Sequence, residues 1–281
     1  MRTQKWTEEK IDRWIKEGRG QGEGSNYRPW LTVHDVPGAK GRCHRPWSPK
    51  FGRKLELLSD VEYNIFQILD CSPYVIALKE QYPIDRKLSQ QVAARLGIRH
   101  PTYPGTHVPC VMTVDFLATF QRDGKRAQIG IDAKRSNQLE DASVIRKLQL
   151  TRACLAERGH EHLVICEKHL PKQLLSNLQR IRSARPHEDE HFPYPNYLEE
   201  VTERLYKYLS TRAFGATPLR VVCQNFDELI EGEPGTALRA ARLLIDSRRL
   251  QVDLLRGDIE KLPMSAFRLA PEDGAKLAVG A

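Results

Sequence analysis

Two apolar, β-branched runs that flank a short polar segment constrain the fold of this chain more than any other feature. The runs are CVMTVDFLATF (110–120) and AQIGIDAK (127–134), and QRDGKR joins them. Asp123-Gly124 within the joining segment is a strong hairpin signal, because these residue types accept the positive φ that tight turns need. The pattern predicts two adjacent antiparallel strands.

Helical and strand patterns alternate around this hairpin. SDVEYNIFQILD (59–70) has helical spacing and opens with Ser59-x-x-Glu62, which is a helix-start signature. The other patterned segments are, in order, a strand VIALKEQYPI, a helix LSQQVAARLGI, a helix SVIRKLQLTRACLAERG and a strand HLVICE. Together they predict an α/β core over about 55–170.

The pattern changes beyond this core. EEVTERLYKYLSTRAF has helical spacing without strand alternation, and TALRAARLLIDSRRLQVDLLRGDI reads as a helix followed by two short strands around Arg256-Gly257. A helix followed by a small hairpin is how winged-helix domains commonly end. We therefore expect a mainly helical, winged-helix-like interaction domain at 171–281.

The N-terminal segment 1–54 carries the excess positive charge of the chain. It holds 13 Lys/Arg against 6 Asp/Glu, whereas the rest of the chain holds 31 against 30. Its richness in Gly and Pro predicts an extended arm. A cationic arm with aromatic side chains suits contact with nucleic acid, although basic termini are often merely solvated. The residues that suggest this contact are Trp30, Arg42, His44, Arg45, Trp47 and Lys50.

Three charged side chains interrupt the two otherwise apolar strands of the hairpin. Asp132 and Lys134 project from one face, because side chains alternate along a strand, and Asp115 can approach the same face from the preceding strand. An Asp followed by Asp-x-Lys across a hairpin is the arrangement of the PD-(D/E)xK nucleases. A cross-strand salt bridge between Lys134 and one aspartate explains the local pattern equally well.

Phosphodiester cleavage needs these residue types. A divalent metal polarises the phosphate and lowers the pKa of a water, and a cation stabilises the charge that develops. Glu62 would add a third carboxylate, although a glutamate at this helix position often only binds the cap. We expect Mg²⁺, or Mn²⁺ as a substitute, on Asp115 and Asp132, and Glu62 and the carbonyl of Ala133 could also ligate it. His100 and His107 are weaker candidates for contact with water or phosphate.

Other features exclude several classes of protein. The six cysteines form no CxxC pair and no spacing typical of a zinc site, so we expect them to be structural. No segment has the unbroken apolar length of a membrane span, and the start lacks the apolar core of a secretory signal. We expect a cytoplasmic protein.

Taken together, these residues resemble the TnsA endonuclease subunits of heteromeric transposases. The most specific parts of the resemblance are SDVEYNIFQILD, IALKEQYPI, LGIRHPTY, VMTVDF and the IDAK strand with the helix after it. It implies a restriction-endonuclease-like domain with catalytic residues Glu62, Asp115 and Lys134, followed by a domain of winged-helix character. Some relatives carry glutamine on the second strand, where this chain has Asp132.

The resemblance also implies an activity and partners. Such a subunit cuts the 5′ strand of double-stranded DNA at transposon ends, a DDE-type transposase cuts the transferred 3′ strand, and an AAA+ ATPase regulator engages the C-terminal domain.

Two other functions stay open at this point. A winged-helix DNA-binding regulator without catalysis would bind DNA without metal, and a self-sufficient restriction-type nuclease would cut DNA alone.

Overall fold

The computed structural model describes residues 6–36, 42–187 and 189–270. The predicted N-terminal arm and C-terminal domain each include residues outside these ranges. The chain divides into two compact units, Met1–Leu170 and Pro171–Ala281. Each unit has its own core and is described by itself.

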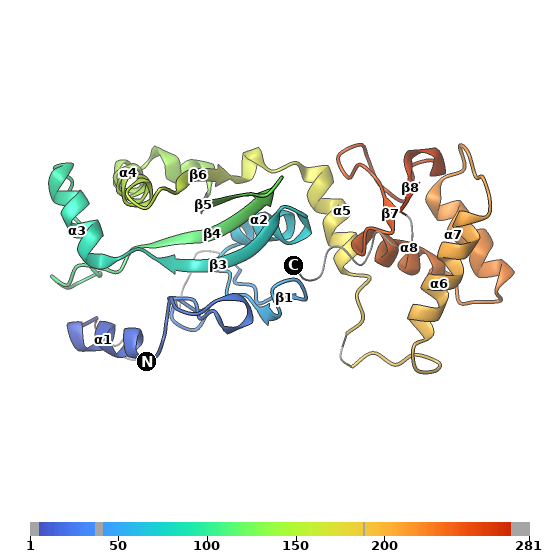
Figure 1. Cartoon of the computed structure of the whole chain (residues 1–281), viewed down its shortest axis with the longest axis horizontal. Coiled ribbons are helices and arrows are strands. Elements are labelled where there is room, and N and C mark those ends of the chain that lie inside the picture. The colour runs from blue at the N-terminus through green and yellow to red at the C-terminus, as the bar shows by residue number, and fades with distance from the viewer. Residues whose placement is uncertain (1–5, 37–41, 188, 271–281) are drawn as a thin grey trace. The chain divides into compact units, whose positions relative to one another are not determined.

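A four-stranded mixed sheet forms the centre of the first unit (Figure 1). The strands lie in the order β3-β4-β5-β6, with antiparallel pairing from β3 to β5 and a parallel pair β5-β6. Their bounds are β3 Val75–Pro83, β4 Thr113–Arg122, β5 Lys125–Lys134 and β6 Glu161–Cys166. The predictions of a mixed α/β fold and of these strands are confirmed.

The predicted hairpin joins β4 to β5. Asp123 and Gly124 form the turn with φ of 50° and 74°, which is the left-handed region that a two-residue hairpin turn needs. Phe116 pairs with Ile131 in the register of the two strands. Because the strands are antiparallel, the beginning of β4 and the end of β5 lie at the same end of this strand pair. We call this end of the strands the sheet edge.

Helices form at the predicted places before and after these strands. Their bounds are α2 Asp60–Cys71, α3 Arg86–Arg95 and α4 Ala142–Ala156, with short 3-10 helices η2 Ser136–Glu140 and η3 Glu167–His169. Ser59 caps α2, since its hydroxyl oxygen accepts a hydrogen bond from the Glu62 N–H. The helix α4 approaches β5 closely at Gly130, where a Cβ atom would lie 2.4 Å from the Leu155 side chain.

The prediction of an extended arm over 1–54 is wrong for the described part of that segment. It contains α1 Glu8–Lys16, the 3-10 helix η1 Gly24–Asn26 and the paired strands β1 Trp47–Ser48 and β2 Arg53–Lys54. Ile11, Trp14 and Trp30 form an apolar cluster with Tyr103, and Arg53 makes a buried ion pair with Glu80 of β3. The partners that order the segment are therefore distant in sequence.

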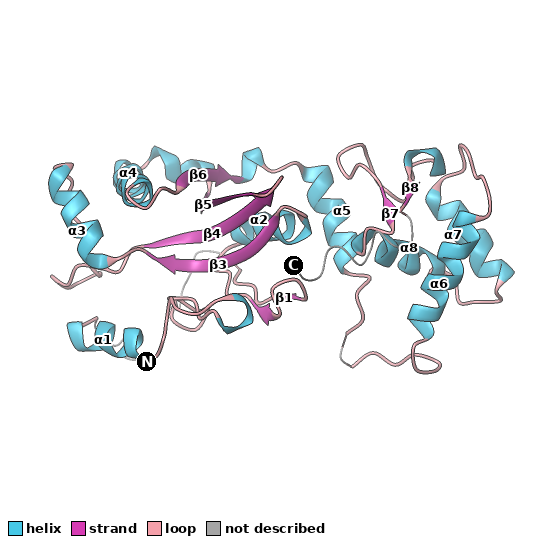
Figure 2. Ribbon diagram, in the orientation of Figure 1, coloured by secondary structure: helices cyan, strands magenta, loops and turns pink. Residues whose placement is uncertain are grey.

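The second unit is mainly helical (Figure 2). Its elements are α5 Lys172–Arg182, α6 Tyr197–Ser210, α7 Leu219–Leu229, α8 Thr236–Asp246, β7 Leu250–Gln251, η4 Met264–Ala266 and β8 Arg268–Leu269. The helices bury one core, in which Leu205, Leu219 and Leu244 are fully enclosed. The predicted helical run and the predicted helix 236–246 are confirmed.

The two short strands after α8 differ from the expected hairpin. They pair across a long connection instead of turning at Arg256-Gly257. Buried Asn177 of α5 explains the difference, because its amide donates to the carbonyls of Leu254 and Gly257 at 2.8 and 2.7 Å. Its oxygen accepts from the N–H of Ile259 at 3.3 Å. These side-chain bonds satisfy backbone groups that a strand partner would otherwise satisfy.

The cysteines are free, and Cys154, Cys166 and Cys223 are buried, as expected of small apolar side chains. Among the described residues, no helix is long and apolar enough to cross a membrane.

Candidate active site

Asp115, Asp132 and Lys134 meet at the edge of the sheet where β4 begins and β5 ends. The Lys134 ammonium donates to Asp115 Oδ2 at 3.0 Å and to Asp132 Oδ1 at 3.1 Å. Asp115 Oδ2 also accepts from the N–H of Ala133 at 2.7 Å. The cross-strand salt bridge that the sequence left open is therefore present, and it includes both aspartates.

Glu62 enters the site from the first turn of α2. Its two oxygens accept from the Ser59 hydroxyl at 2.9 Å and from the Leu58 N–H at 2.9 Å, so the glutamate does bind the helix start. Burial and the nearby charge of Asp115 nevertheless raise the pKa of Glu62 to about 8. Glu62 therefore both caps the helix and lies close enough to Asp115 to be affected by its charge.

Two side chains that the sequence did not suggest contact these carboxylates. The Gln81 amide donates to Glu62 Oε2 at 3.1 Å, and the His162 Nε2 lies 2.9 Å from Asp132 Oδ2. Gln81 is a buried non-glycine residue with φ of 45°, an unusual backbone conformation inside a strand. A pair of buried polar residues within VIALKEQYPI was the available signal for Gln81, whereas nothing in EHLVIC marked His162.

The electrostatics of the site are unbalanced. Burial raises the pKa of Asp115, and the charge of Asp132 adds to this effect while Lys134 opposes it. Burial also opposes ionisation of Asp132, but hydrogen bonds from His162 and Lys134 hold its pKa below the usual range. One lysine thus faces three carboxylates, whose side chains are largely enclosed.

The donor set has the chemistry of a hard divalent cation site. All the candidate ligands offer oxygen, which Mg²⁺ prefers. The charge of Asp115 opposes ionisation of Glu62, and a bound cation would relieve this effect. Within the described ranges, however, no group of three His, Cys, Asp or Glu side chains could by itself hold a metal ion. The Lys134 ammonium instead contacts three predicted ligands, because it also donates to the Ala133 carbonyl at 2.9 Å.

The two candidate histidines lie apart from this cluster. His100 uses both ring nitrogens locally, with Nε2 2.9 Å from the Ser89 hydroxyl and Nδ1 2.9 Å from the Pro101 carbonyl. His107 is exposed in the loop before β4. Neither side chain has a hydrogen bond to Asp115 or Lys134 among the described contacts.

Most of the side chains that suggested nucleic-acid contact in the N-terminal segment have partners within the protein. Trp30 is 2% exposed and therefore cannot stack on a base. His44 and Arg45 pair with Asp60 and Glu56, each at 2.8 Å. The remaining members of the set are Arg42, which lies 3.5 Å from Asp60, Trp47, which is 54% exposed, and Lys50, which donates to carbonyls at the end of α2.

Comparisons with known proteins assign the chain to a family. Residues 72–167 match the family model described as TnsA-like endonuclease N terminal, and residues 169–254 match the model described as TnsA endonuclease C terminal. The chain is 34% identical over 244 residues to the Transposon Tn7 transposition protein TnsA of Escherichia coli, which covers 85% of this chain and 84% of that protein. The chain belongs to the TnsA endonuclease family.

Proposed function

We propose that this chain is the metal-dependent endonuclease subunit of a heteromeric, Tn7-like transposase, and that it cuts the non-transferred 5′ strand at transposon ends. Family membership supports a nuclease that works in transposition. The observation that carries the site assignment is the meeting of Asp115, Asp132 and Lys134 at one sheet edge, with Glu62 held close enough for its pKa to rise.

Glu62, Asp115, Asp132 and the Ala133 carbonyl would hold Mg²⁺, for which Mn²⁺ could substitute. The chemistry supplied there is polarisation of the scissile phosphate and a lower pKa of a water. Lys134 stays charged, because Asp115 and Asp132 raise its pKa although burial opposes this. We propose that the Lys134 ammonium stabilises negative charge on the phosphate as the bond breaks.

The proposal includes the architecture of the two units and their partners. We propose that the first unit has the restriction-endonuclease-like fold and that 171–281 is winged-helix-like. The partners would be double-stranded DNA at transposon ends, a DDE-type transposase that cuts the 3′ strand, and an AAA+ regulator bound through the C-terminal unit. A regulator without catalysis has no use for three enclosed carboxylates around a lysine, so the site supports the nuclease.

Strand-resolved mapping of nicks tests this function. End-labelled element DNA is incubated with Mg²⁺, the transposase and the regulator, and the products are separated on denaturing gels. Asp115→Asn keeps an oxygen that can accept from Ala133 but removes a ligand charge. We expect a roughly 10³-fold loss of 5′-strand cutting, equivalent to several kcal/mol of lost metal-assisted catalysis, with the 3′ cut retained.

Asp12→Asn on the exposed face of α1 is the matched control, since it removes the same charge away from the sheet edge. Cutting at the wild-type rate by Asp115→Asn would refute the site. If the wild type binds DNA equally well with and without metal and cuts neither strand, the DNA-binding regulator is favoured. If it cuts DNA without any partner, a self-sufficient nuclease is favoured.

A further inference from the structure

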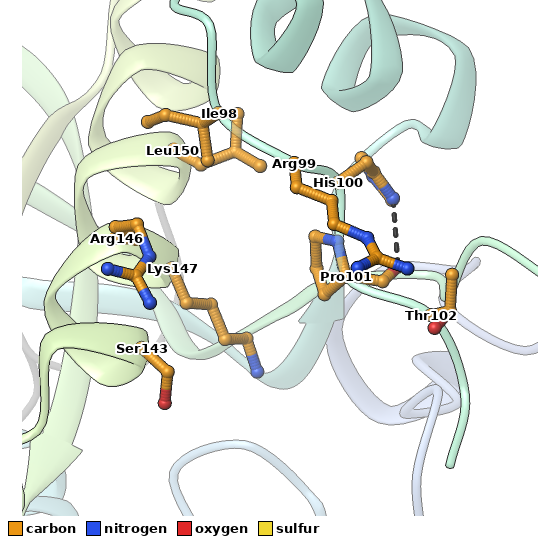
Figure 3. A pocket seen from close by; sticks show the side chains of 9 residues that line it. All are labelled: Ile98, Arg99, His100, Pro101, Thr102, Ser143, Arg146, Lys147 and Leu150. Carbon is orange, nitrogen blue, oxygen red and sulfur yellow. Dashed lines mark hydrogen bonds between the residues drawn. The ribbon is translucent and has the colours of Figure 1, made fainter. Parts of the chain in front are cut away.

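A pocket outside the carboxylate site lies between the segment that follows α3 and the first half of α4. Its volume is about 330 Å³. Arg99 and His100 line it from the segment after α3, whereas Ser143, Arg146 and Lys147 line it from the helix (Figure 3). The pocket is therefore concave, basic and built from two separate parts of the first unit.

The three cations of this pocket lack partners. In the described part of the chain, no hydrogen bond or ion pair engages the side chain of Arg99, Arg146 or Lys147. The two arginines of the adjacent α3 differ, since Arg86 pairs with Glu8 and Arg95 pairs with Glu157. Uncompensated positive charge in a concave surface concentrates anions there.

Asp141 is an acidic neighbour of Ser143 and Arg146, which line the pocket. The Asp141 carboxylate caps α4 by accepting from the N–H of Ser143 at 2.7 Å. Hydrogen bonds from Ser143 lower the pKa of Asp141 more than Arg146 does, so this carboxylate is committed to the helix start. The three cationic side chains outnumber the Asp141 carboxylate, which is occupied by hydrogen bonds, so the pocket has a net positive charge.

The position of the pocket connects it with the cutting site. The segment that lines it runs on into β4, which begins at Thr113, two residues before Asp115. The other wall, α4, follows β5 after the short helix η2, and β5 ends at Lys134. Both walls are thus attached to the sheet edge that holds the carboxylates.

We propose that this pocket binds a backbone phosphate of the DNA, at a nucleotide close to the phosphate that is cut. The inference rests on the nuclease function proposed above. Arginine donates paired N–H groups to phosphate oxygens, so Arg99 and Arg146 suit this ligand. An acidic protein segment would offer carboxylates instead, but a DNA strand must cross this sheet edge to be cut, which favours DNA.

Equilibrium binding at several salt concentrations tests the pocket. The full chain is titrated into a fluorescent duplex that carries a transposon end, in EDTA so that no strand is cut. Arg146→Gln/Lys147→Gln removes two pocket charges. Lys125→Gln/Arg126→Gln, at the turn end of the same sheet, removes one lysine and one arginine and serves as the matched control.

We expect the pocket variant to bind roughly tenfold more weakly and to reduce the dependence of log K on log salt by about 1 to 2, because each lost phosphate contact removes close to 0.9 from that slope. The hairpin variant should stay near the wild type. Equal changes in both variants, or no measurable DNA binding by the wild type, would overturn the inference. Arg146→Lys, which keeps the charge, should retain most of the slope.

A competition arm separates DNA from a small phosphate ligand. Binding of inorganic phosphate by the wild type but not by the pocket variant, with equal duplex binding by the two proteins, would assign the pocket to a free phosphate and overturn the inference. Release of the duplex by phosphate at matched ionic strength from the wild type alone would show that both ligands occupy the pocket. Binding in EDTA is independent of cutting. If the pocket variant binds DNA normally and Asp115→Asn does not cut, the pocket is refuted and the proposed function stands. If the pocket variant binds DNA weakly and Asp115→Asn cuts at the wild-type rate, the pocket stands and the proposed function fails.

Discussion

Two groups of enclosed charge lie along the same sheet and differ in how they are balanced. On β3, Glu80 is 0% exposed, and its two oxygens accept from Arg53 at 2.7 and 2.5 Å. At the sheet edge, Lys134 donates to both Asp115 and Asp132, His162 lies 2.9 Å from Asp132, and Glu62 has a pKa of about 8. The first group joins the N-terminal segment to the sheet, whereas the second contains more carboxyl groups than cations and keeps protons on them.

The difference distinguishes buried charges with a structural role from those that we propose take part in chemistry. A buried ion pair with all its acceptors satisfied gains nothing from a further ligand. A group of carboxylates that holds its own protons is poised to exchange them for a cation, and strongly perturbed pKa values cluster at functional sites. Removing one cation from each group tests whether the two groups have these different roles.

The largest effect on stability should follow Arg53→Met. It leaves the Glu80 carboxylate buried without its partner, so we expect the free energy of unfolding to fall by about 3 to 5 kcal/mol. Arg95→Met is the matched control, because Arg95 pairs with Glu157 and both side chains are exposed, at 60% and 43%, and such a pair contributes about 1 kcal/mol or less. Urea denaturation measures both, and equal losses would contradict a structural role for the Arg53–Glu80 pair.

Lys134→Met should separate metal binding from cutting. The ammonium contacts Asp115, Asp132 and the Ala133 carbonyl, which are also the proposed metal ligands, so its removal should tighten Mg²⁺ binding. Cutting should nevertheless fall by roughly 10² to 10³-fold, since the cation that stabilises the developing charge is lost.

Calorimetric titration with Mg²⁺ measures the first effect of Lys134→Met, and nick mapping measures the second. Lys125→Met at the other end of β5 serves as the control for loss of one positive charge. Weaker Mg²⁺ binding by Lys134→Met, in the same direction as Asp115→Asn, would show that the ammonium does not compete with metal.

The same contrast explains how much could be predicted from the sequence. The hairpin was predictable because its information is local: Asp123-Gly124 specifies the turn, and strand alternation places Asp132 and Lys134 on one face. Glu62 could be placed on its helix for the same reason. Its nearness to Asp115 depends on how α2 packs against the sheet, which only the family resemblance supplied.

Three features escaped prediction because their causes are long-range. The N-terminal segment looked extended, but its order comes from Glu80 and Tyr103, which lie far along the chain. Asn177 determines the connection between β7 and β8 from another helix. His162 reaches Asp132 only because β6 pairs with β5 in a parallel register.

The pH dependence of stability should reveal the proton that Glu62 holds. Its pKa is about 8 in the folded chain and near 4.5 when unfolded, so the folded state binds more protons between these values. The metal-free chain should therefore lose stability as pH rises from about 5 to 8, by up to about 1.4 kcal/mol per pH unit for one proton. Asp115 acts in the same direction, because its pKa is also raised.

Denaturation curves at several pH values measure this effect, with Glu62→Gln as the comparison. The variant should show a flatter dependence, because it has no proton to lose at this position. Excess Mg²⁺ should offset the loss in the wild type, since metal binding requires the ionised carboxylate. Parallel curves for the two proteins would show that Glu62 is already ionised at neutral pH.

The smallest effect should come from Gln81→Leu, which tests how the site tunes Glu62. The Gln81 amide donates to Glu62 Oε2, and a donor to a carboxylate favours its ionised form. Loss of this bond is worth about 1 kcal/mol, so Mg²⁺ should bind roughly fivefold more weakly at neutral pH. The deficit should shrink at higher pH, where Glu62 loses its proton without help.

Thr113→Val is the control for Gln81→Leu, because the Thr113 hydroxyl lies 3.5 Å from the Gln81 amide oxygen and has no described bond to Glu62. Mg²⁺ titrations at neutral and alkaline pH compare the two variants with the wild type. A deficit that is the same at both pH values would mean that Gln81 shapes the site through packing. A deficit that disappears at alkaline pH would show that Gln81 lowers the pKa of Glu62. The Arg53–Glu80 pair needs no such donor, because Arg53 donates to both carboxylate oxygens of Glu80.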